Sequence, residues 1–439
     1  MSVSRRQFVQ NLGALSALGL TAGLAGRLPT SEAATGARSV PATTVPTGTG
    51  ISGRVVVIGG GMAGTSVARY LRLWGGDKVQ VTLVERNAAY TSNIMSNGVL
   101  TGQSTMSTLR YSHATLASRY GVSVVTAEAQ AVDAGARTVR LSTGSSVPYD
   151  RLVVAPGLVF DALPGLSAGD YDTRFPHAWQ AGAQTTLLRQ QLLAMPAKGT
   201  YVMTIPAAPY RCPPGPYERA CLVADWLKKN KPGSKVVVLD ANPKIIAEPI
   251  AFGHAFTATH AGVVQYVPNA MIDHVDAARR TVYTSAGNFT ADVLNPIPPH
   301  RAGAIAQNAG LVNVGGRWAG VDVLSYESTA VPGIHVIGDT IGTTQPKSGH
   351  MANAQGKVAA DAITRLLSGQ PVGTAPVTSS ACYSPITMST ASWLTGVFQY
   401  DPATKTMVTT SISEAPSVTA GNYSDMSKWF RGLMNDTFA

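Results

Sequence analysis

A glycine-rich turn between two apolar segments constrains the fold of this chain more than any other feature. Residues 54–58 read Arg-Val-Val-Val-Ile, which predicts a buried strand, and residues 59–64 read Gly-Gly-Gly-Met-Ala-Gly before a helical stretch through Leu73. A second apolar run over residues 79–84 ends at Glu85. Strand, glycine turn, helix, strand and acid in this order form the fingerprint of a dinucleotide-binding unit. The order therefore predicts an α/β fold.

Each position of this fingerprint has a predicted role at the cofactor. Gly59 permits the tight turn, Gly61 lets the backbone approach a pyrophosphate, and Gly64 allows the helix to pack closely on the strand. Glu85 is placed to bind a ribose hydroxyl, and we assign the adjacent Arg86 to the same site.

Two later segments are predicted to complete this site. Residues 151–157 form a strand that ends in a tight turn, and residues 333–339 form a strand that ends in Gly-Asp, before a helix over residues 351–367. This order resembles the flavoproteins related to glutathione reductase, which have two dinucleotide domains. The resemblance implies that Asp339 holds the flavin ribityl chain and that the helix N-terminus, which stabilises negative charge, points at the isoalloxazine. The alternative for Asp339 is a loop aspartate that caps a helix. The predicted cofactor residues from these segments are Ala155, Gly157, Gly338, Asp339, Lys347, Ser348 and Gly349.

A second strand–helix–strand pattern occupies the middle of the chain. Residues 200–205 and 235–239 predict strands on either side of a helix over residues 217–229, and the second strand leads to Asp240. The connecting turn, residues 206–216, contains five prolines and a single glycine. Proline lacks a backbone N–H, so this turn cannot wrap a pyrophosphate as a glycine-rich turn does. The pattern predicts a second dinucleotide-type domain in which nicotinamide binding is disfavoured.

The three cysteines are too few and too far apart for a disulfide scaffold or a four-ligand zinc site, so no metal site is predicted. Cys212 lies in the proline-rich turn, and we expect Cys382 to lie in a loop as well. Two interpretations stay open for them: a redox-active pair beside the flavin, or a structural disulfide or unrelated free thiols. Cys221 falls on the apolar face of the predicted helix and is expected to be a buried core thiol.

Two charged neighbours give the redox interpretation its chemistry. Arg211 precedes Cys212 and is expected to stabilise its thiolate, and an anionic substrate would be drawn to such a basic site. Glu218 is placed to shuttle a substrate proton, although the helix dipole alone also favours a glutamate in the first helical turn. The predicted catalytic residues are therefore Cys212, Cys382 and Glu218.

The N-terminus predicts export. Arg5 and Arg6 precede an apolar run over residues 12–25 and a small-residue cleavage zone, which is typical of a twin-arginine leader over residues 1–34. The apolar run is shorter than the roughly 20 residues that cross a bilayer, so stable membrane insertion is not expected. The formal charge of +10 comes from 34 basic and 24 acidic residues scattered along the chain, so nucleic-acid binding is not expected either. We predict a periplasmic protein.

Several longer segments resemble one flavoprotein family. Residues 205–220 resemble the active-site loop of the flavoprotein subunit of flavocytochrome c sulfide dehydrogenase. Further segments that resemble the same subunit are residues 295–303, 346–357, 381–384 and 435–439. The matches are spread over most of the chain.

This resemblance implies two dinucleotide-type domains plus a C-terminal domain, bound FAD, and a c-type cytochrome subunit as partner. It also implies that Cys212 and Cys382 match the redox disulfide of the family and that Glu218 matches the acidic residue beside it. In the family chemistry, hydrosulfide attacks the disulfide and leaves a persulfide on one cysteine. FAD then accepts two electrons, and heme c of the partner removes them singly.

The chain departs from the family at the flavin-tethering position. Members commonly attach FAD through a cysteine in a Cys-x-x-Ser-Asn pattern, whereas residues 93–97 here read Asn-Ile-Met-Ser-Asn. Asn93 cannot form a thioether, so we predict noncovalent FAD and a divergent family member. The sequence has no Cys-x-x-Cys-His motif, so heme c is expected only in a partner subunit. Trp429 matches a tryptophan near the flavin in the family, and the apolar spacing of residues 423–438 predicts a helix in the core or at a partner interface.

The predicted organisation has six parts. They are a leader (1–34), a linker (35–53), a first FAD-binding part (54–165), a second dinucleotide-type domain with the Cys212 loop (166–300), a second FAD-binding part (301–370) and a C-terminal domain (371–439). The leading hypothesis is a periplasmic FAD-dependent sulfide dehydrogenase that oxidises sulfide or a related sulfur anion and passes electrons to a c-type cytochrome. A sulfide:quinone oxidoreductase and a non-catalytic flavin electron-carrier subunit are the alternatives. The proline-rich turn disfavours an NADH-dependent disulfide reductase.

Overall fold

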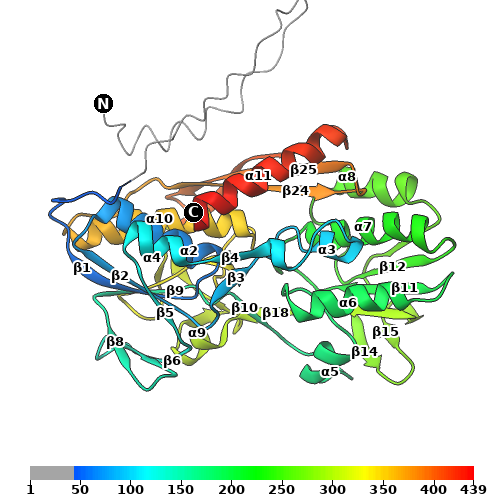
Figure 1. The fold of residues 1–439 in the computed structure, drawn as a ribbon, viewed down its shortest axis with the longest axis horizontal. Helices are drawn as coiled ribbons and strands as arrows, with labels where there is room; N and C mark the ends of the chain where they lie inside the picture. Colours follow the sequence, from blue (N-terminus) through cyan, green and yellow to red (C-terminus); the bar gives the residue numbers. More distant parts are fainter. Residues whose placement is uncertain (1–43) are drawn as a thin grey trace, which may run out of the picture. The chain divides into compact units, whose positions relative to one another are not determined.

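The strand that leads into the glycine turn is the middle one of five parallel strands in a seven-stranded sheet (Figure 1). The structure is a computed structural model that describes residues 44–439; the predicted leader and residues 35–43 of the predicted linker lie outside the described residues. In spatial order the sheet consists of β21 (Val321–Asp322), β22 (Glu327–Ser328), β23 (Ile334–Val336), β9 (Arg151–Val154), β1 (Gly53–Ile58), β2 (Val79–Glu85) and β5 (Ser123–Thr126). The five strands from β23 to β5 run parallel, and β21 and β22 extend the sheet in antiparallel fashion.

Strands from distant parts of the chain meet at β9. Val153 of β9 pairs with Val57 of β1 on one side and with His335 of β23 on the other. All three residues are fully buried, as is usual for parallel strands covered on both faces. Helices α2 (Met62–Gly75) and α10 (Gly349–Leu367) pack against each other on this sheet. The two segments predicted to bind one cofactor thus share one sheet.

A second, smaller parallel sheet forms the other half of the molecule. Its strands are, in spatial order, β13 (Val264–Val267), β12 (Lys235–Asp240), β11 (Thr200–Ile205) and β17 (Val293–Pro296). The crossover from β11 to β12 is α7 (Gly215–Asn230), and α6 (Ala183–Ala194) and α8 (Pro249–His254) belong to the same half. The α7 helix begins two residues earlier than the sequence predicts, because Pro214 and Pro216 fit the first turn, where no N–H is needed.

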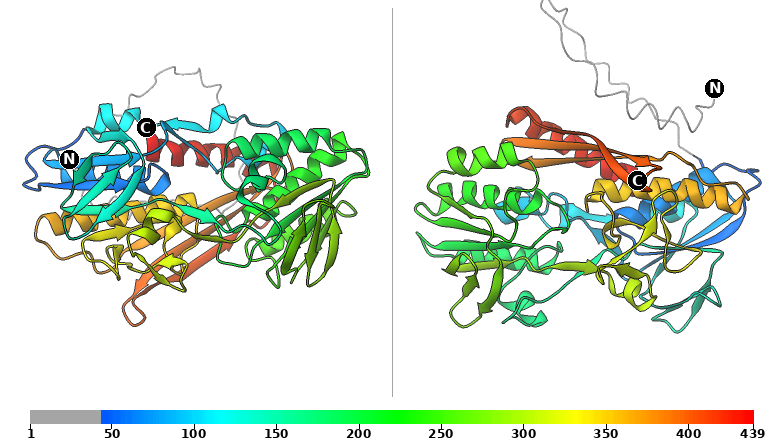
Figure 2. Two further views of the ribbon diagram at one scale, coloured as in Figure 1. Left: turned by 90° about the horizontal axis from the view of Figure 1, so that it is seen from below. Right: turned by 180° about the vertical axis from the view of Figure 1, so that it is seen from behind.

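The C-terminal segment forms an antiparallel sheet and a long helix along the side where the two halves meet (Figure 2). The sheet contains β24 (Val377–Pro385), β25 (Ala391–Asp401) and β26 (Thr406–Glu414), followed by α11 (Ala420–Phe438). β24 contacts both α10 and α7, and α11 packs on α2 through its buried apolar face. The helix predicted at the C-terminus therefore lies in the core. The prediction that Cys382 lies in a loop is wrong, because it sits in the middle of β24 and pairs with Leu394 of β25.

Short elements complete the fold. The paired strands are β3 (Ala89–Thr91) with β4 (Arg110–Ser112), β6 (Ala129–Asp133) with β7 (Thr138–Leu141) and β8 (Ser146–Pro148), β10 (Leu158–Phe160) with β18 (His300–Ala302), β14 (Ile272–Asp276) with β15 (Thr281–Thr284) and β16 (Gly287–Thr290), and β19 (Val312–Val314) with β20 (Trp318–Ala319). The short helices are α3 (Asn97–Thr101), α4 (Ala114–Tyr120), α5 (Ala168–Thr173) and α9 (Ala304–Asn308). Within residues 44–439 there is no helix with both the length and the apolar character needed to cross a membrane. The predicted fold class, two Rossmann-like units plus a C-terminal part, is confirmed.

Candidate functional site

A cavity of about 1350 Å³ lies between the glycine turn, the Cys212 loop, β24 and the N-terminus of α10. The predicted residues that line it are Gly59, Gly61, Glu85, Arg86, Ala155, Gly157, Cys212, Glu218, Gly338, Asp339, Ser348, Gly349 and Cys382. Gly64 and Lys347 are the two predicted site residues that do not line it. One cavity therefore brings together the predicted flavin contacts and all three predicted catalytic residues.

The glycines of the turn have different tasks. A Cβ at Gly59 would lie 2.3 Å from the Ala155 carbonyl oxygen, and a Cβ at Gly64 would lie 1.8 Å from the Gly59 carbonyl oxygen. These two positions need glycine for the fold itself. Gly61 has open space instead, because the nearest atom to its Cβ position belongs to Tyr90 at 3.9 Å. Gly61 precedes the first turn of α2, which has no acidic residue and no side-chain cap, so its N–H groups are available to an anionic pyrophosphate.

The acid of the fingerprint lies beside this turn. One Glu85 carboxylate oxygen accepts a hydrogen bond from the Gly60 N–H at 2.7 Å, and the other accepts from the Asn87 N–H at 2.8 Å. Glu85 and Arg86 both line the cavity, next to the glycine turn. The carboxylate is therefore held in place where a ribose would lie.

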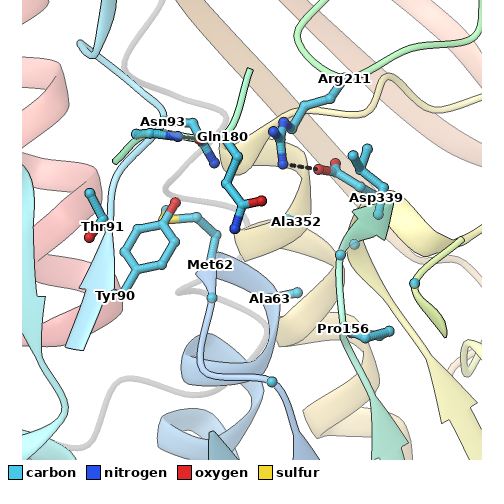
Figure 3. A pocket seen from close by; sticks show the side chains of 18 of the residues that line it. Met62, Ala63, Tyr90, Thr91, Asn93, Pro156, Gln180, Arg211, Asp339 and Ala352 are labelled. Atoms are coloured by element: carbon cyan, nitrogen blue, oxygen red, sulfur yellow. Dashed lines mark hydrogen bonds and ion pairs between the residues drawn. The ribbon is translucent and has the colours of Figure 1, made fainter. Parts of the chain in front are cut away.

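The Gly-Asp segment brings Asp339 into the cavity (Figure 3). The Arg211 guanidinium lies 3.8 Å from the Asp339 carboxylate, on the opposite wall. Burial raises the pKa of Asp339, and the charge of Arg211 opposes that rise. Lys347 lies behind the wall: its ammonium donates to the Asp339 carbonyl at 2.9 Å and sits 3.7 Å from the centre of the Trp318 ring. Lys347 thus braces the loop that carries Asp339 rather than facing the cavity.

The N-terminus of α10 faces the same cavity. Ser348 caps the helix by accepting a hydrogen bond from the Met351 N–H at 3.1 Å, and its hydroxyl lies 2.9 Å from the Ser380 hydroxyl of β24. The first turn contains no acidic residue, and Gly349 and His350 line the cavity. The positive end of the helix dipole is therefore directed at the space where negative charge on a reduced flavin would reside.

Cys212 and Cys382 line one end of the cavity. All three thiols of the chain are free, and Cys221 is fully buried in α7, as predicted for a core thiol. The Cys212 backbone has φ of +56° and is held by a hydrogen bond from its N–H to the Lys347 carbonyl at 2.7 Å. Such a positive φ is uncommon outside glycine, so the turn holds Cys212 in a strained backbone conformation.

Arg211 favours a Cys212 thiolate, as expected, but burial outweighs its effect. Burial raises the pKa of Cys212 to about 12, the charge of Glu218 adds to this rise, and Arg211 opposes it only in part. Burial also raises the pKa of Cys382 well above its usual value. The direct contacts of Arg211 are with Asp339 and the Trp179 carbonyl. Both cysteines are therefore thiols at neutral pH when they are not bonded to each other.

Glu218 lies in the first turn of α7, next to the cysteines, and is partly buried. Burial raises the pKa of Glu218 to about 8, and the side-chain amide of Asn97 opposes this rise. Asn97 donates to the Glu218 carboxyl at 2.8 Å, while its own carbonyl oxygen accepts from the Arg219 guanidinium at 2.9 Å. Arg219 thereby fixes the orientation of the amide. Sequence reasoning missed Asn97 and Arg219, because they are 122 positions apart and only the fold joins them.

Aromatic and polar side chains close the same end of the cavity. Trp429, which the family resemblance puts near the flavin, lines the cavity beside His350 and Tyr383. Its indole N–H is buried and has no hydrogen-bond partner among the described residues. His350 accepts a hydrogen bond from the Ala381 N–H at 2.9 Å, which holds it against β24. The unpaired indole N–H is available to donate a hydrogen bond to a bound group.

The position that corresponds to Glu85 in the second half is Asp240, and both of its carboxylate oxygens accept hydrogen bonds from residues of the fold. Its carboxylate accepts from the Tyr217 and Tyr266 hydroxyls at 2.7 and 2.8 Å, and from the Asn242 backbone and side-chain N–H groups at 2.9 and 2.7 Å. Asp240 is fully buried. The saturated carboxylate and the prolines at the start of α7 both act against binding of a second dinucleotide.

At the tethering position, Asn93 lies in the cavity wall (Figure 3) and accepts a hydrogen bond from the Ala181 N–H at 2.7 Å. Among the described residues, no group of three or more His, Cys, Asp or Glu side chains could hold a metal ion.

Three family models match the chain. Residues 53–192 match the pyridine nucleotide-disulphide oxidoreductase model. Residues 185–298 match the central region of the flavoprotein chain of sulfide dehydrogenase (flavocytochrome c), and residues 374–438 match the flavin-binding region of flavocytochrome c sulphide dehydrogenase. The first model covers the glycine turn, the second covers Cys212 and Glu218, and the third covers Cys382 and Trp429.

Individual proteins are similar over shorter or more distant stretches. An NADH dehydrogenase-like protein of Mycobacterium tuberculosis is 54% identical over 54 residues, which is 12% of this chain and 14% of the relative. The chain therefore matches about a seventh of the length of these curated relatives.

Among solved structures, the sulfide:quinone oxidoreductase from Aquifex aeolicus superposes with a TM-score of 0.70 at 18% identity, covering 88% of this chain and 92% of that one. An NAD-dependent persulfide reductase from A. fulgidus gives 0.58 at 17% identity, covering 87% and 76%. These structures share the fold. With the two models specific to its central and C-terminal regions, the chain belongs to the family of the flavoprotein chain of flavocytochrome c sulfide dehydrogenase.

Proposed function

We propose that the protein oxidises sulfide, or a related sulfur anion, with bound FAD and the cysteines Cys212 and Cys382. One observation carries the proposal: both cysteines and Glu218 line the end of the same cavity that the glycine turn, Asp339 and the α10 N-terminus line elsewhere. A dinucleotide cofactor and a thiol pair in one enclosed space are the parts needed to move two electrons from sulfur to flavin.

The residues present fit FAD. The open space at Gly61 and the free N–H groups of α2 would take the pyrophosphate, Glu85 the ribose, and Asp339 the ribityl chain. When bound, the flavin supplies an acceptor for two electrons that can be released one at a time. Since Asn93 cannot form a thioether, binding is noncovalent, and acid precipitation of the holoprotein is expected to release all flavin into the supernatant. Flavin that stays with the precipitated chain would contradict this.

The cysteine pair and Glu218 supply the sulfur chemistry. In the oxidised enzyme, Cys212 and Cys382 form a disulfide; hydrosulfide attacks it, the S–S bond breaks, and a new S–S bond leaves a persulfide on one cysteine. The other sulfur leaves as a thiolate. Because the pKa of Glu218 is about 8, its carboxyl is protonated at neutral pH and can give that thiolate a proton. The disulfide forms again when the outer persulfide sulfur leaves at the oxidation level of elemental sulfur and a bound flavin accepts the two electrons; Glu218 can then take the proton back from the thiol.

The location and the electron acceptor belong to the same proposal. The twin-arginine pattern at Arg5 and Arg6 supports export to the periplasm, and the family description supports a c-type cytochrome subunit that carries the heme. The protein is then one subunit of a complex in which electrons leave the flavin singly.

Anaerobic bleaching of the flavin band tests the proposal. Sulfide is added to one sample of the mature holoprotein and NADH to another. We expect rapid bleaching by sulfide, loss of that bleaching in Cys382→Ser, and no bleaching by NADH. A flavin that sulfide leaves oxidised would contradict the proposal. Mass spectrometry of a nonreduced digest checks the pairing, and a bridge between Cys212 and Cys221 would exclude the mechanism.

Reduction of quinone is a second candidate, because the sulfide:quinone oxidoreductase from Aquifex aeolicus shares the fold over most of both chains. It requires membrane association and a route for quinone to the flavin. Fractionation of the protein with membranes, together with sulfide-dependent reduction of a soluble quinone, would favour it over the cytochrome.

A further inference from the structure

A buried carboxyl outside the cavity has no role in the chemistry described so far. Glu248 precedes α8 with a φ of +48° and is completely buried. One of its carboxyl oxygens accepts a hydrogen bond from the Ser384 hydroxyl at 2.5 Å. The other oxygen has no hydrogen-bond partner among residues 44–439. An enclosed carboxylate with an unpaired oxygen is costly, so this group is suited to hold a proton and to release it.

The contact through Ser384 connects Glu248 to the strand that carries Cys382. Side chains two positions apart on a strand point to the same face, so Ser380, Cys382 and Ser384 form one row on β24. Ser380 contacts the Ser348 hydroxyl at the start of α10, and its own hydroxyl favours the Cys382 thiolate. The row therefore runs from the helix N-terminus at the cavity, past the Cys382 sulfur, to the buried carboxyl.

The groups that face Glu248 are mostly acidic. They are Glu414 from β26, Glu218 and Cys221 from α7, and Cys382 and Ser384 from β24. Burial raises the pKa of Glu248 to about 7, the hydroxyls of Ser384 and of Ser392 on β25 oppose the rise, and Glu414 adds to it. Near neutral pH the carboxyl is thus divided between its two protonation states, which is the condition for efficient proton transfer.

We propose that Glu248 is a second acid–base residue of the cysteine site, exchanging a proton with Cys382 through the Ser384 hydroxyl. Side chains two positions apart on a strand are separated by roughly 6.6 Å, which one bridging water spans. In this proton transfer the Cys382 S–H bond breaks and an O–H bond forms on Glu248. No group is oxidised or reduced. This is a proton route separate from Glu218, which reaches the cysteines from the cavity side. Its role in sulfide oxidation rests on the proposed function.

The pH dependence of Cys382 alkylation in the reduced holoprotein tests this route without any sulfide. Iodoacetamide labelling is followed at Cys382 by mass spectrometry at several pH values on both sides of 7. In the wild type we expect the rate to rise as Glu248 ionises. In Glu248→Gln this rise is lost and the rate above pH 7 falls roughly tenfold. Ser384→Ala gives the same loss, and the double variant loses no more than either single one.

A matched control and two opposite outcomes make the test decisive. Glu414→Gln removes a neighbouring charge that raises the pKa of Glu248, and it leaves Ser384 in place; the rise in labelling rate is expected to remain and to move to lower pH. If Glu248 acts only as a negative charge, Glu248→Gln lowers the pKa of Cys382 and labelling becomes faster, which overturns the proposal. An unchanged profile in folded Glu248→Gln and Ser384→Ala overturns it as well. If sulfide fails to bleach wild-type flavin, the sulfide function is wrong, while the labelling profile still reports on Glu248.

Discussion

The two dinucleotide-type halves are built alike, and they differ at the two places where a dinucleotide is bound. In the first half, the turn after β1 is glycine-rich, Gly61 faces open space, and Glu85 lies at the cavity. In the second half, the turn after β11 is proline-rich and Asp240 gives all its hydrogen-bond capacity to the fold. Both halves thus contain the strand–helix–strand unit, but only the first half has the features of a nucleotide-binding site.

The difference shows what the second half gained. The turn that would wrap a second pyrophosphate holds Cys212 at a positive φ and starts α7 so that Glu218 lies beside it. In the proposed function, electrons reach the flavin from a sulfur compound at this turn, where a nicotinamide would otherwise lie. The same frame serves as a cofactor holder in one half and as a thiol holder in the other.

The largest effect is expected from filling the open space in the first turn. Gly61→Val should abolish FAD retention, because its side chain occupies the pyrophosphate position, while the fold stays intact. The ratio of flavin to protein absorbance measures this. Ala207→Val, at an exposed position of the second turn, should keep full FAD. Gly64→Val should prevent folding, because its Cβ would lie 1.8 Å from the Gly59 carbonyl oxygen. Normal FAD in Gly61→Val would place the cofactor elsewhere.

The next largest effect is expected at Glu218, the carboxyl beside Cys212. Glu218→Gln should lower the rate of sulfide-dependent flavin reduction by roughly 100-fold, the usual contribution of a proton-transfer group. In the wild type this rate should fall as pH rises through about 8, because the buried carboxyl then loses the proton that it donates. Stopped-flow bleaching across pH measures both. If the rate of flavin reduction in Glu218→Gln still falls near pH 8, another group titrates there.

A smaller effect is expected for the saturated carboxylate. Asp240→Asn should destabilise the protein by about 1–3 kcal/mol, since two tyrosine hydroxyls lose a charged acceptor. Urea unfolding measures this, with Asp273→Asn as a control whose carboxylate is 79% exposed. Asp240→Asn should not gain reduction by NADH. If NADH does bleach its flavin, the second half has kept a nicotinamide site.

The smallest effect is expected at Asn97, which shapes Glu218 without touching sulfur. Asn97→Ala removes the amide that donates to the carboxyl, so the pKa of Glu218 should rise further. The fall in the rate of flavin reduction near pH 8 should then move to higher pH. Asn97→Asp should raise the pKa of Glu218 more than Asn97→Ala, because it adds a negative charge. If the rate of flavin reduction falls at the same pH in both variants as in the wild type, Asn97 has no influence on Glu218.

Local patterns predicted the parts of the site that depend on neighbours in the sequence. The strand–turn–helix around Gly59 and the helix that starts at Gly349 follow from apolar spacing and glycine positions. The Ser-rich segment around Cys382 lacks the apolar alternation of a strand, and it forms one only because β25 pairs with it. The thiol pKa values could not be predicted either, because they depend on burial by residues far away in the chain.

The position of β23 beside β9 also determines when the molecule can be completed during synthesis. The strands of the second half come from one continuous stretch, so this half can form its sheet as soon as it leaves the ribosome. The first half needs β23 and α10, which are made after the whole second half. The part encoded first is therefore completed after the second half, and FAD can be loaded only onto a chain that is nearly complete.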